Sequence, residues 1–178
     1  MKDSKETFVV NLSTSLAFEK MVEAHGCSVE RSAIGEINVV QKMLEVGAEL
    51  GGEGNGGVIL KEVHLGRDSL VAAAALLQRL SLTDQPLGDV MSQLPQFEIV
   101  KDKVSVEGIE ANVLFEKIAK SFDDASKDER DGLKLSWNDR WVHIRTSNTE
   151  PILRIYAEAP TASEARHIDQ NVKTIMNG

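Results

Sequence analysis

The first half of the chain alternates short apolar runs with stretches in which apolar residues recur at helical spacing. The expected elements are a strand at 8–12, a helix from 16 that Gly26 ends, a strand at 27–34, a helix at 36–46, short strands at 48–50 and 58–60, and a helix at 69–80. The run Ser13-Thr14-Ser15 and Asp68 stand where helix caps are expected. Strands and helices in this alternation predict a layered α/β domain with largely parallel strand pairing.

The second half has a different order. A stretch at 81–95 contains two prolines and a short amphipathic piece, and it predicts a connection between domains. Beyond it we expect a strand at 97–104, a helix at 111–122, three strands including 141–145 and 152–158, and a last helix that begins with the capping box of Thr161 and Glu164. The polar run 123–132 predicts a solvated loop.

This order predicts a smaller α+β domain with an antiparallel sheet and helices on one face. Alternation in the strand at 141–145 places Val142 and Ile144 on one side and Trp141, His143 and Arg145 on the other. The predicted division is therefore an α/β domain at 1–82, a linker at 83–95 and an α+β domain at 96–178.

Composition restricts the function without identifying it. The chain has 178 residues, 42% of them hydrophobic, and a formal net charge of −8, which argues against nucleic-acid and anionic-membrane binding. A small anionic ligand stays open, because a phosphate responds to local donors more than to net charge. Cys27 is the single cysteine, which excludes an internal disulfide and fits a cytoplasmic protein. The four histidines lack metal-ligand spacing, so no metal site is expected.

The polar start of the sequence has no apolar core, so we expect a fragment start rather than a signal peptide.

One polar segment, from Arg145 to Arg154, joins two predicted strands. Alternation puts both arginines on the same face, off the core, where each guanidinium can give paired N–H bonds to a phosphate. The connecting loop adds the side chains of Ser147, Asn148 and Thr149. The plain alternative is a polar hairpin made of ordinary turn-forming residues, and spacing alone leaves the two interpretations about equal.

A second segment, from Gly51 to Gly57, has five glycines around Glu53 and Asn55. Such a run allows positive φ and a close approach of backbone to a ligand. A strand follows it instead of a helix, and no Gly-Lys-Ser/Thr is present, so neither a dinucleotide fingerprint nor a P-loop fits. A flexible hairpin is the plain alternative.

The string Arg145-Thr-Ser-Asn-Thr-Glu-Pro151, followed by Arg154, resembles the phosphate-binding loop in the last domain of the α-D-phosphohexomutases, the phosphoglucomutase/phosphomannomutase family. The resemblance implies that Arg145, Ser147, Asn148 and Thr149, supported by Arg154, hold the substrate phosphate that is not reacting.

The glycine segment resembles the same family's sugar-binding loop, Gly-Glu-x-Ser-Gly-His. Glu53 matches the acid that binds sugar hydroxyls, Asn55 stands where many members have Ser, and Gly57 where they have His. The loss of the imidazole puts any acid/base role there in doubt. Residues 32–36 and 66–68 resemble further segments of the family, so the resemblance covers nearly all of the chain after residue 7, as third and then fourth domain.

The family's catalytic segments are a Thr-Ala-Ser-His-Asn-Pro serine loop and an Asp-x-Asp-x-Asp-Arg magnesium loop, and neither occurs in this sequence. The resemblance thus places Mg²⁺ and the phosphoserine in a missing N-terminal half and no catalytic residue in this chain, which we expect to be inactive alone. The complete enzyme would interconvert hexose 6-phosphate and hexose 1-phosphate through a bisphosphate intermediate. Its ligands would be phosphorylated hexoses and hexose 1,6-bisphosphate.

Two other functions stay open, a stand-alone non-catalytic sugar-phosphate-binding module and a purely structural partner domain. Glucose, mannose and glucosamine differ at C2 of the sugar, and no residue can be assigned to contact the substituent there. The sequence therefore does not choose among these three sugars.

Overall fold

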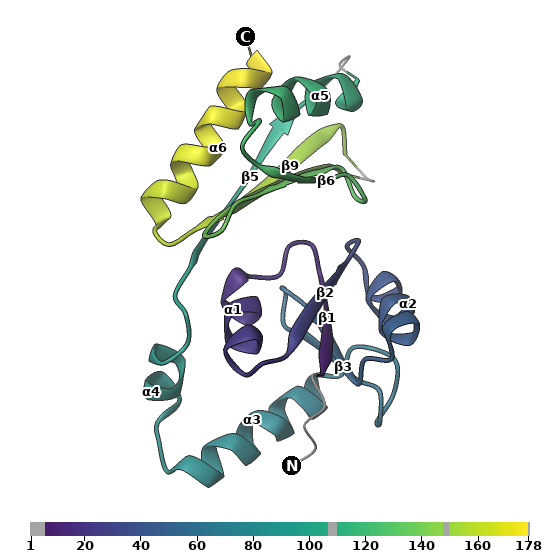
Figure 1. The fold of residues 1–178 in the computed structure, drawn as a ribbon, viewed down its shortest axis with the longest axis vertical. Coiled ribbons are helices and arrows are strands. Elements are labelled where there is room, and N and C mark those ends of the chain that lie inside the picture. The colour runs from purple at the N-terminus through teal and green to yellow at the C-terminus, as the bar shows by residue number, and fades with distance from the viewer. Residues whose placement is uncertain (1–5, 107–109, 148–149, 178) are drawn as a thin grey trace. The chain divides into compact units, whose positions relative to one another are not determined.

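A computed structural model describes residues 6–106, 110–147 and 150–177. The chain divides into two compact units, which we call the first unit (up to Gln96) and the second unit (from Phe97 on). Each has its own sheet and helices (Figure 1). None of the helices in the described ranges is long and apolar enough to cross a membrane.

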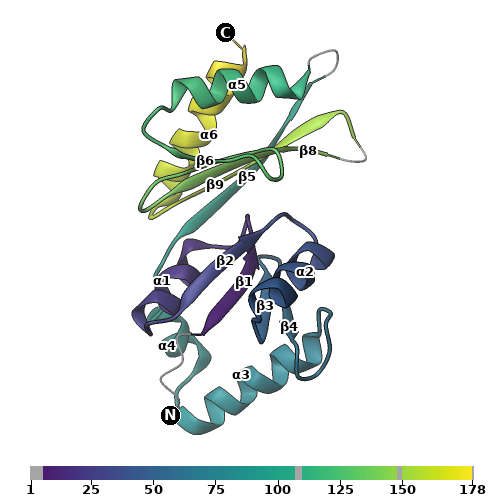
Figure 2. The same cartoon turned by 45° about the vertical axis from the view of Figure 1, so that its right-hand side comes forward.

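The first unit is a layered α/β structure, as expected. Its elements are β1 (Thr7–Asn11), α1 (Leu16–Ala24), β2 (Ser28–Ser32), α2 (Glu36–Val46), β3 (Leu50–Glu53), β4 (Gly57–Leu60), α3 (Ser69–Thr83) and α4 (Leu87–Ser92). The sheet order is β2-β1-β3-β4, with β1 parallel to both neighbours and β3 and β4 forming an antiparallel hairpin. Helices α1 and α2 lie on opposite sides of this sheet (Figure 2).

Local chemistry accounts for the helix ends in this unit. The Ser15 side chain accepts a hydrogen bond from the backbone N–H of Ala17 at the start of α1, and the Asp68 carboxylate caps α3 in the same way. Helix α2 ends at Gly47, whose φ of 71° is left-handed and suits glycine. Its buried Val39 and Met43 pack with Val9 and Ile59 of the sheet, so α2 sets the position of the hairpin formed by β3 and β4.

The second unit has the expected antiparallel sheet. Its elements are β5 (Glu98–Ser105), α5 (Ala111–Ser121), β6 (Ser126–Asp128), β7 (Leu133–Ser136), β8 (Trp141–Thr146), β9 (Ile152–Ala159) and α6 (Ala162–Asn177). The strand order is β5-β9-β8-β7-β6, and α5 and α6 cover the same face of the sheet (Figure 2). The capping box forms at α6, where the backbone N–H of Glu164 donates to Thr161 Oγ1 over 3.2 Å.

Strand β6 corrects the sequence prediction for the polar run at 123–132. Ser126–Asp128 pairs with β7, and Lys127 lies opposite Leu135. Strand pairing uses backbone groups, and a short edge strand needs no apolar alternation, so its side chains gave no strand signal. The unit therefore has one strand more than expected, and three residues of the segment expected to be a loop belong to the sheet.

The alternation predicted for β8 and β9 is confirmed. Val142 and Ile144 lie in the core between the sheet and the helices, together with Ile155 of β9. Arg145 and Arg154 lie on the opposite face, directly across from each other in register. This register places the predicted phosphate-binding arginines side by side at one end of the hairpin formed by β8 and β9.

Candidate functional site

The hairpin of β8 and β9 carries the predicted phosphate-binding residues. Arg145 is the penultimate residue of β8, and Arg154, its register partner, is the third residue of β9. The backbone N–H of Ser147 donates to the carbonyl of Ile152 over 3.0 Å, which holds the two strands together just before the loop. Asn148 and Thr149 lie outside the described residues. The structure therefore brings together Arg145, Arg154 and Ser147.

Arg145 lies in the central strand of the sheet, and one of its hydrogen-bond donors is unsatisfied among the described residues. Its side chain is 21% exposed, and its Nη1 lies 3.9 Å from Asp131 Oδ2. Its Nε is buried, and among the described residues it has no hydrogen-bond partner. A buried donor without an acceptor costs stability, and a ligand oxygen could satisfy it.

Asp131 was not predicted as part of this site, because the sequence placed it in a solvated loop. The turn that contains it packs closely against β8, since a Cβ added at Gly132 would overlap the backbone carbonyl of Ile144. Its φ of 76° also favours glycine. An Asp-Gly pair before a strand is a turn signal, but nothing in the sequence indicates that this turn lies next to Arg145.

His143, a residue of β8, connects this strand to the same turn. It is 1% exposed, and its Nε2 lies 2.6 Å from the backbone carbonyl of Asp131. A carbonyl only accepts, so the Nε2 hydrogen is the donor. Burial lowers the pKa of His143, with positive charge on Lys134 and Arg145 adding to the effect. The imidazole is therefore neutral near pH 7, and its hydrogen bond holds the turn at Asp131 against β8.

The predicted sugar-binding acid, Glu53, ends β3 and is buried, with 5% of its side chain exposed. Its Oε1 accepts hydrogen bonds from Asn11 Nδ2 over 3.0 Å and from the backbone N–H of Gly35 over 3.2 Å. Its Oε2 lies 3.3 Å from Arg67 Nη1. One carboxylate thus joins β1, the start of α2 and the segment before α3.

Asn55 lies at the turn between β3 and β4. Its Oδ1 accepts a hydrogen bond from the backbone N–H of Gly57 over 3.2 Å, an Asx-turn contact that stabilises the loop. This contact occupies the carbonyl oxygen of the side chain, so the amide N–H groups are the part of Asn55 suited to meet a ligand.

Only part of this glycine segment uses the positive φ that the sequence allows. Gly51 and Gly52 belong to β3, and within 51–57 only Gly56 has a positive φ, of 95°. A Cβ added at Gly51 would overlap the sulfur of Met43, and one at Gly52 would lie 2.7 Å from the carbonyl oxygen of Gly57. These two positions need glycine for packing inside the unit rather than for contact with a ligand.

Arg67 was not predicted in the site, although its segment was noted as a resemblance. Its Nε donates to Glu36 Oε2 over 2.7 Å while its Nη1 contacts Glu53, so one guanidinium bridges two carboxylates. The hydrogen bond from Arg67 lowers the pKa of Glu36, and the same contact raises the pKa of Arg67. The bridge keeps a partly exposed positive charge beside the buried Glu53.

Gly57 leaves space for this bridge. A Cβ added there would overlap Cδ of Arg67, because the arginine stem crosses the glycine. The space that a side chain at position 57 would fill is therefore taken by Arg67. The guanidinium beside this position stays protonated near neutral pH.

Among the described residues, no group of three or more His, Cys, Asp or Glu side chains is arranged to hold a metal ion. The described residues therefore do not provide a ligand set for magnesium.

Comparison with known proteins gives the family. Residues 1–97 match the family model for the phosphoglucomutase/phosphomannomutase alpha/beta/alpha domain III, and residues 101–175 match the model for the C-terminal domain. The chain belongs to the phosphoglucomutase/phosphomannomutase family. The two matches occur in the order expected from the resemblance, third domain and then fourth.

Named relatives extend over nearly all of this chain. A phosphoglucomutase/phosphomannomutase of Thermococcus kodakarensis is 31% identical over 94% of the chain and 37% of its own length. A phosphoglucosamine/phosphogalactosamine mutase of Sulfurisphaera tokodaii is 28% identical over 96% of the chain and 38% of its own length. The chain thus spans well under half the length of these curated relatives.

Solved structures agree on the fold. A family member from Burkholderia thailandensis superposes with a TM-score of 0.80, at 24% identity over 98% of this chain and 38% of the other. The Aspergillus fumigatus N-acetylphosphoglucosamine mutase in complex with glucose 1,6-bisphosphate gives a TM-score of 0.69, at 12% identity over 96% of this chain and 38% of the other.

Proposed function

We propose that this chain is the substrate-binding part of a phosphohexomutase. It holds a phosphorylated hexose while groups outside the chain transfer a phosphoryl group between O6 and O1, through a hexose 1,6-bisphosphate intermediate. The observation that carries the proposal is the register pairing of Arg145 with Arg154 next to the loop of the hairpin formed by β8 and β9. Nearby donors and this arginine pair suit a phosphate dianion that is bound but does not react.

The phosphate would supply a hydrogen-bond acceptor for the unsatisfied donor of Arg145. The buried Nε has no partner among the described residues, and Asp131 lies at the long ion-pair distance of 3.9 Å from Nη1. A bound phosphate oxygen gives these donors an acceptor, and charge-assisted hydrogen bonds of this kind are about twice as strong as neutral ones. Ser147, Asn148 and Thr149 would add donors from the loop, with Arg154 on the neighbouring strand.

The sugar would be held at the turn between β3 and β4. Glu53 is fixed by three contacts, and a carboxylate has about four acceptor positions, so one position remains for a sugar hydroxyl. Asn55 would donate from its amide group. The named relatives differ in their hexose, so the proposed ligands are phosphorylated hexoses as a class.

Mg²⁺ and a phosphoserine belong to the proposed complete enzyme and would lie outside this chain. Proximity and orientation of a substrate contribute to rate only where the reacting groups are present. We therefore expect the 178-residue chain alone to give no turnover of glucose 1-phosphate.

The test is isothermal titration of the chain with glucose 1,6-bisphosphate and with inorganic phosphate. We expect Arg145→Ala to weaken binding about tenfold or more, since it removes charge-assisted hydrogen bonds to the phosphate. Arg140→Ala is the matched control. It also removes one guanidinium, but Arg140 pairs with Asp139 in the turn between β7 and β8 and is not part of the proposed loop. Equal affinities in the two variants, or no binding by the wild type, would count against the proposed phosphate loop.

A further inference from the structure

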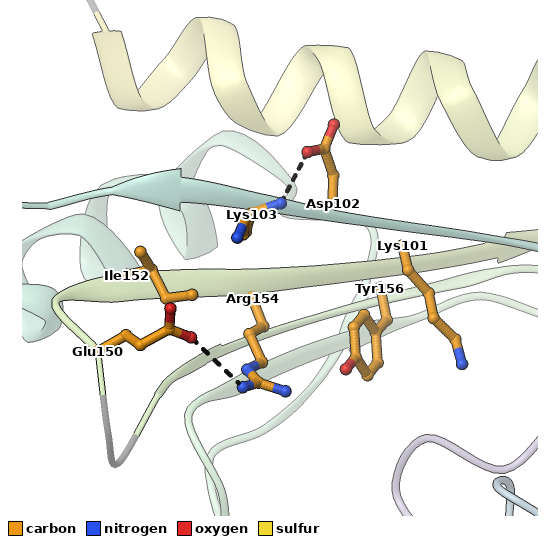
Figure 3. Close-up of a pocket in the computed structure, with 7 residues that line it drawn as sticks. All are labelled: Lys101, Asp102, Lys103, Glu150, Ile152, Arg154 and Tyr156. Carbon is orange, nitrogen blue, oxygen red and sulfur yellow. Dashed lines mark hydrogen bonds and ion pairs between the residues drawn. The ribbon is translucent and has the colours of Figure 1, made fainter.

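A hollow of about 440 Å³ lies on the face of the second unit's sheet that the helices do not cover (Figure 3). Its lining comes from β5, from β9 and from the residue before the proline that precedes β9. The lining residues are Lys101, Asp102, Lys103, Glu150, Ile152, Arg154 and Tyr156. None of the residues predicted for the phosphate loop lies in β5.

Strand register places three cations in one row across the sheet. Lys103 of β5 is opposite Arg154 of β9, and Arg154 is opposite Arg145 of β8. Neighbouring strands lie about 5 Å apart, so Arg154 has a cation on each side. Lys101 stands one position along the same face, opposite Tyr156, and its Nζ lies 5.4 Å from the centre of that ring.

Like charges directly across from each other in a sheet destabilise it. In the described part of the chain, neither Lys101 nor Lys103 has a carboxylate within ion-pair distance, although other lysines do, such as Lys61, which lies 2.8 Å from Glu49. Lys101 and Lys103, which lie on the same face as Arg154 and have no ion-pair partner among the described residues, indicate a local preference for an anion in a chain of net charge −8.

The two carboxylates that line the hollow offset little of this charge. Asp102 points to the other side of the strand (Figure 3). It pairs there with Lys173 of α6. Glu150 lies 3.9 Å from Arg154, and its side chain is 52% exposed. Lys101, Lys103 and Arg154 therefore face the hollow with one loosely held, solvated carboxylate among them.

We propose that this hollow, the β5 anion site (Lys101, Lys103, Arg154 and Tyr156), binds a phosphate group. It adjoins the loop beside Arg145 on the other side of Arg154, and it shares Arg154 and Glu150 with that segment. The ligand class is a small phosphate-bearing anion, which the two ammonium groups and the guanidinium would contact while the Tyr156 hydroxyl adds a hydrogen bond. This site goes beyond the proposed function, because it does not depend on mutase chemistry.

The test is an amide chemical-shift titration of the whole chain with inorganic phosphate, at constant ionic strength. We expect the amides of residues 101–104 to shift with saturation, and Lys103→Gln to weaken that response about three- to tenfold. Lys117→Gln is the matched control, because Lys117 is an exposed lysine on α5, which covers the opposite face of the sheet. A second titration with glucose 6-phosphate shows whether free phosphate or a sugar phosphate binds more tightly. Glucose, which has no phosphate group, controls for binding of the sugar alone.

Arg145→Ala separates the two sites. The β5 response should persist in that variant while the response of amides near the loop is lost, so failure of the loop would leave the β5 anion site standing. The proposal is overturned if the amides of 101–104 do not respond to either phosphate ligand. It is also overturned if Lys103→Gln and Lys117→Gln change their response equally.

Discussion

The carboxylate of Glu53 connects three segments of the first unit that are far apart in sequence. Asn11, Gly35 and Arg67 each contribute one contact to it. Removing the carboxylate would leave a buried amide and a backbone N–H without their acceptor, and a guanidinium without one of its partners. A functional study of Glu53 must therefore separate its structural role from its proposed role in sugar binding.

We expect Glu53→Ala to lower the free energy of unfolding of the first unit by about 2–4 kcal/mol, because several donors lose their partner. Asn55→Ala removes only the exposed contact to the backbone of Gly57 and should cost about 0.5 kcal/mol. Urea denaturation of the two variants and the wild type measures the difference. Similar values for both variants would show that the Glu53 network is not stabilising, and then any loss of sugar binding in Glu53→Ala could be assigned to direct contact.

Some residues of the site could be found from the sequence and others could not. Arg145 and Arg154 were recognisable because strand alternation assigns each residue to a face. Arg67 and Asp131 reach Glu53 and Arg145 only through the packing of segments that are distant along the chain. No local pattern encodes a contact of that kind.

At the scale of the element, His143 holds the turn at Asp131 and Gly132 against β8. The neutral imidazole donates to the Asp131 carbonyl, and burial lowers the pKa of His143. The unfolded chain binds a proton at this histidine near its ordinary pKa of about 6.5, whereas the folded unit resists it. Its contribution to stability is therefore present above about pH 6.5 and is lost as pH falls below it.

We expect the second unit to lose about 1 kcal/mol of stability between pH 7.5 and pH 5.5, and His143→Gln to reduce that slope. His167→Gln, at an exposed position of α6, is the matched control. Thermal or urea unfolding at both pH values measures it. A wild-type stability that does not change over this pH range would contradict the stabilising role of neutral His143.

The carboxylates of the same unit act in a different pH window. Hydrogen bonds from Lys173 and Arg130 lower the pKa values of Asp102 and Asp128, respectively. Their contributions are present above the ordinary carboxyl pKa of about 4 and decline only below it. The two kinds of group can thus be told apart by the pH at which stability changes.

At the scale of the whole molecule, the two units differ in the size of their cores. Among the described residues, ten hydrophobic residues are buried in the first unit and fifteen in the second. Helix α3 of the first unit has no buried residue, and Leu70, Leu77 and Leu82 on it are largely exposed. Because buried apolar area is the main stabilising term, the first unit should be the less stable of the two.

We expect amides of the first unit to exchange with solvent faster than those of β7, β8 and β9, and to lose protection at lower urea concentration. Hydrogen exchange followed by mass spectrometry, peptide by peptide, measures both. Destabilising variants provide the control, since Glu53→Ala should change exchange only in the first unit. One cooperative transition with uniform protection over both units would contradict this expectation.

The sequence by itself determined the order of strands and helices, the capping residues, the two faces of β8 and β9, and the family resemblance of the two loops. These features follow from periodicity and from short motifs, which are local. The tertiary structure decided that Gly51 and Gly52 pack inside a strand, that Ser126–Asp128 joins the sheet, and that Arg67 occupies the space beside Gly57. It also set Lys103 next to Arg154. Each of these depends on strand register or on packing between distant segments, and such contacts have no fixed spacing along the chain.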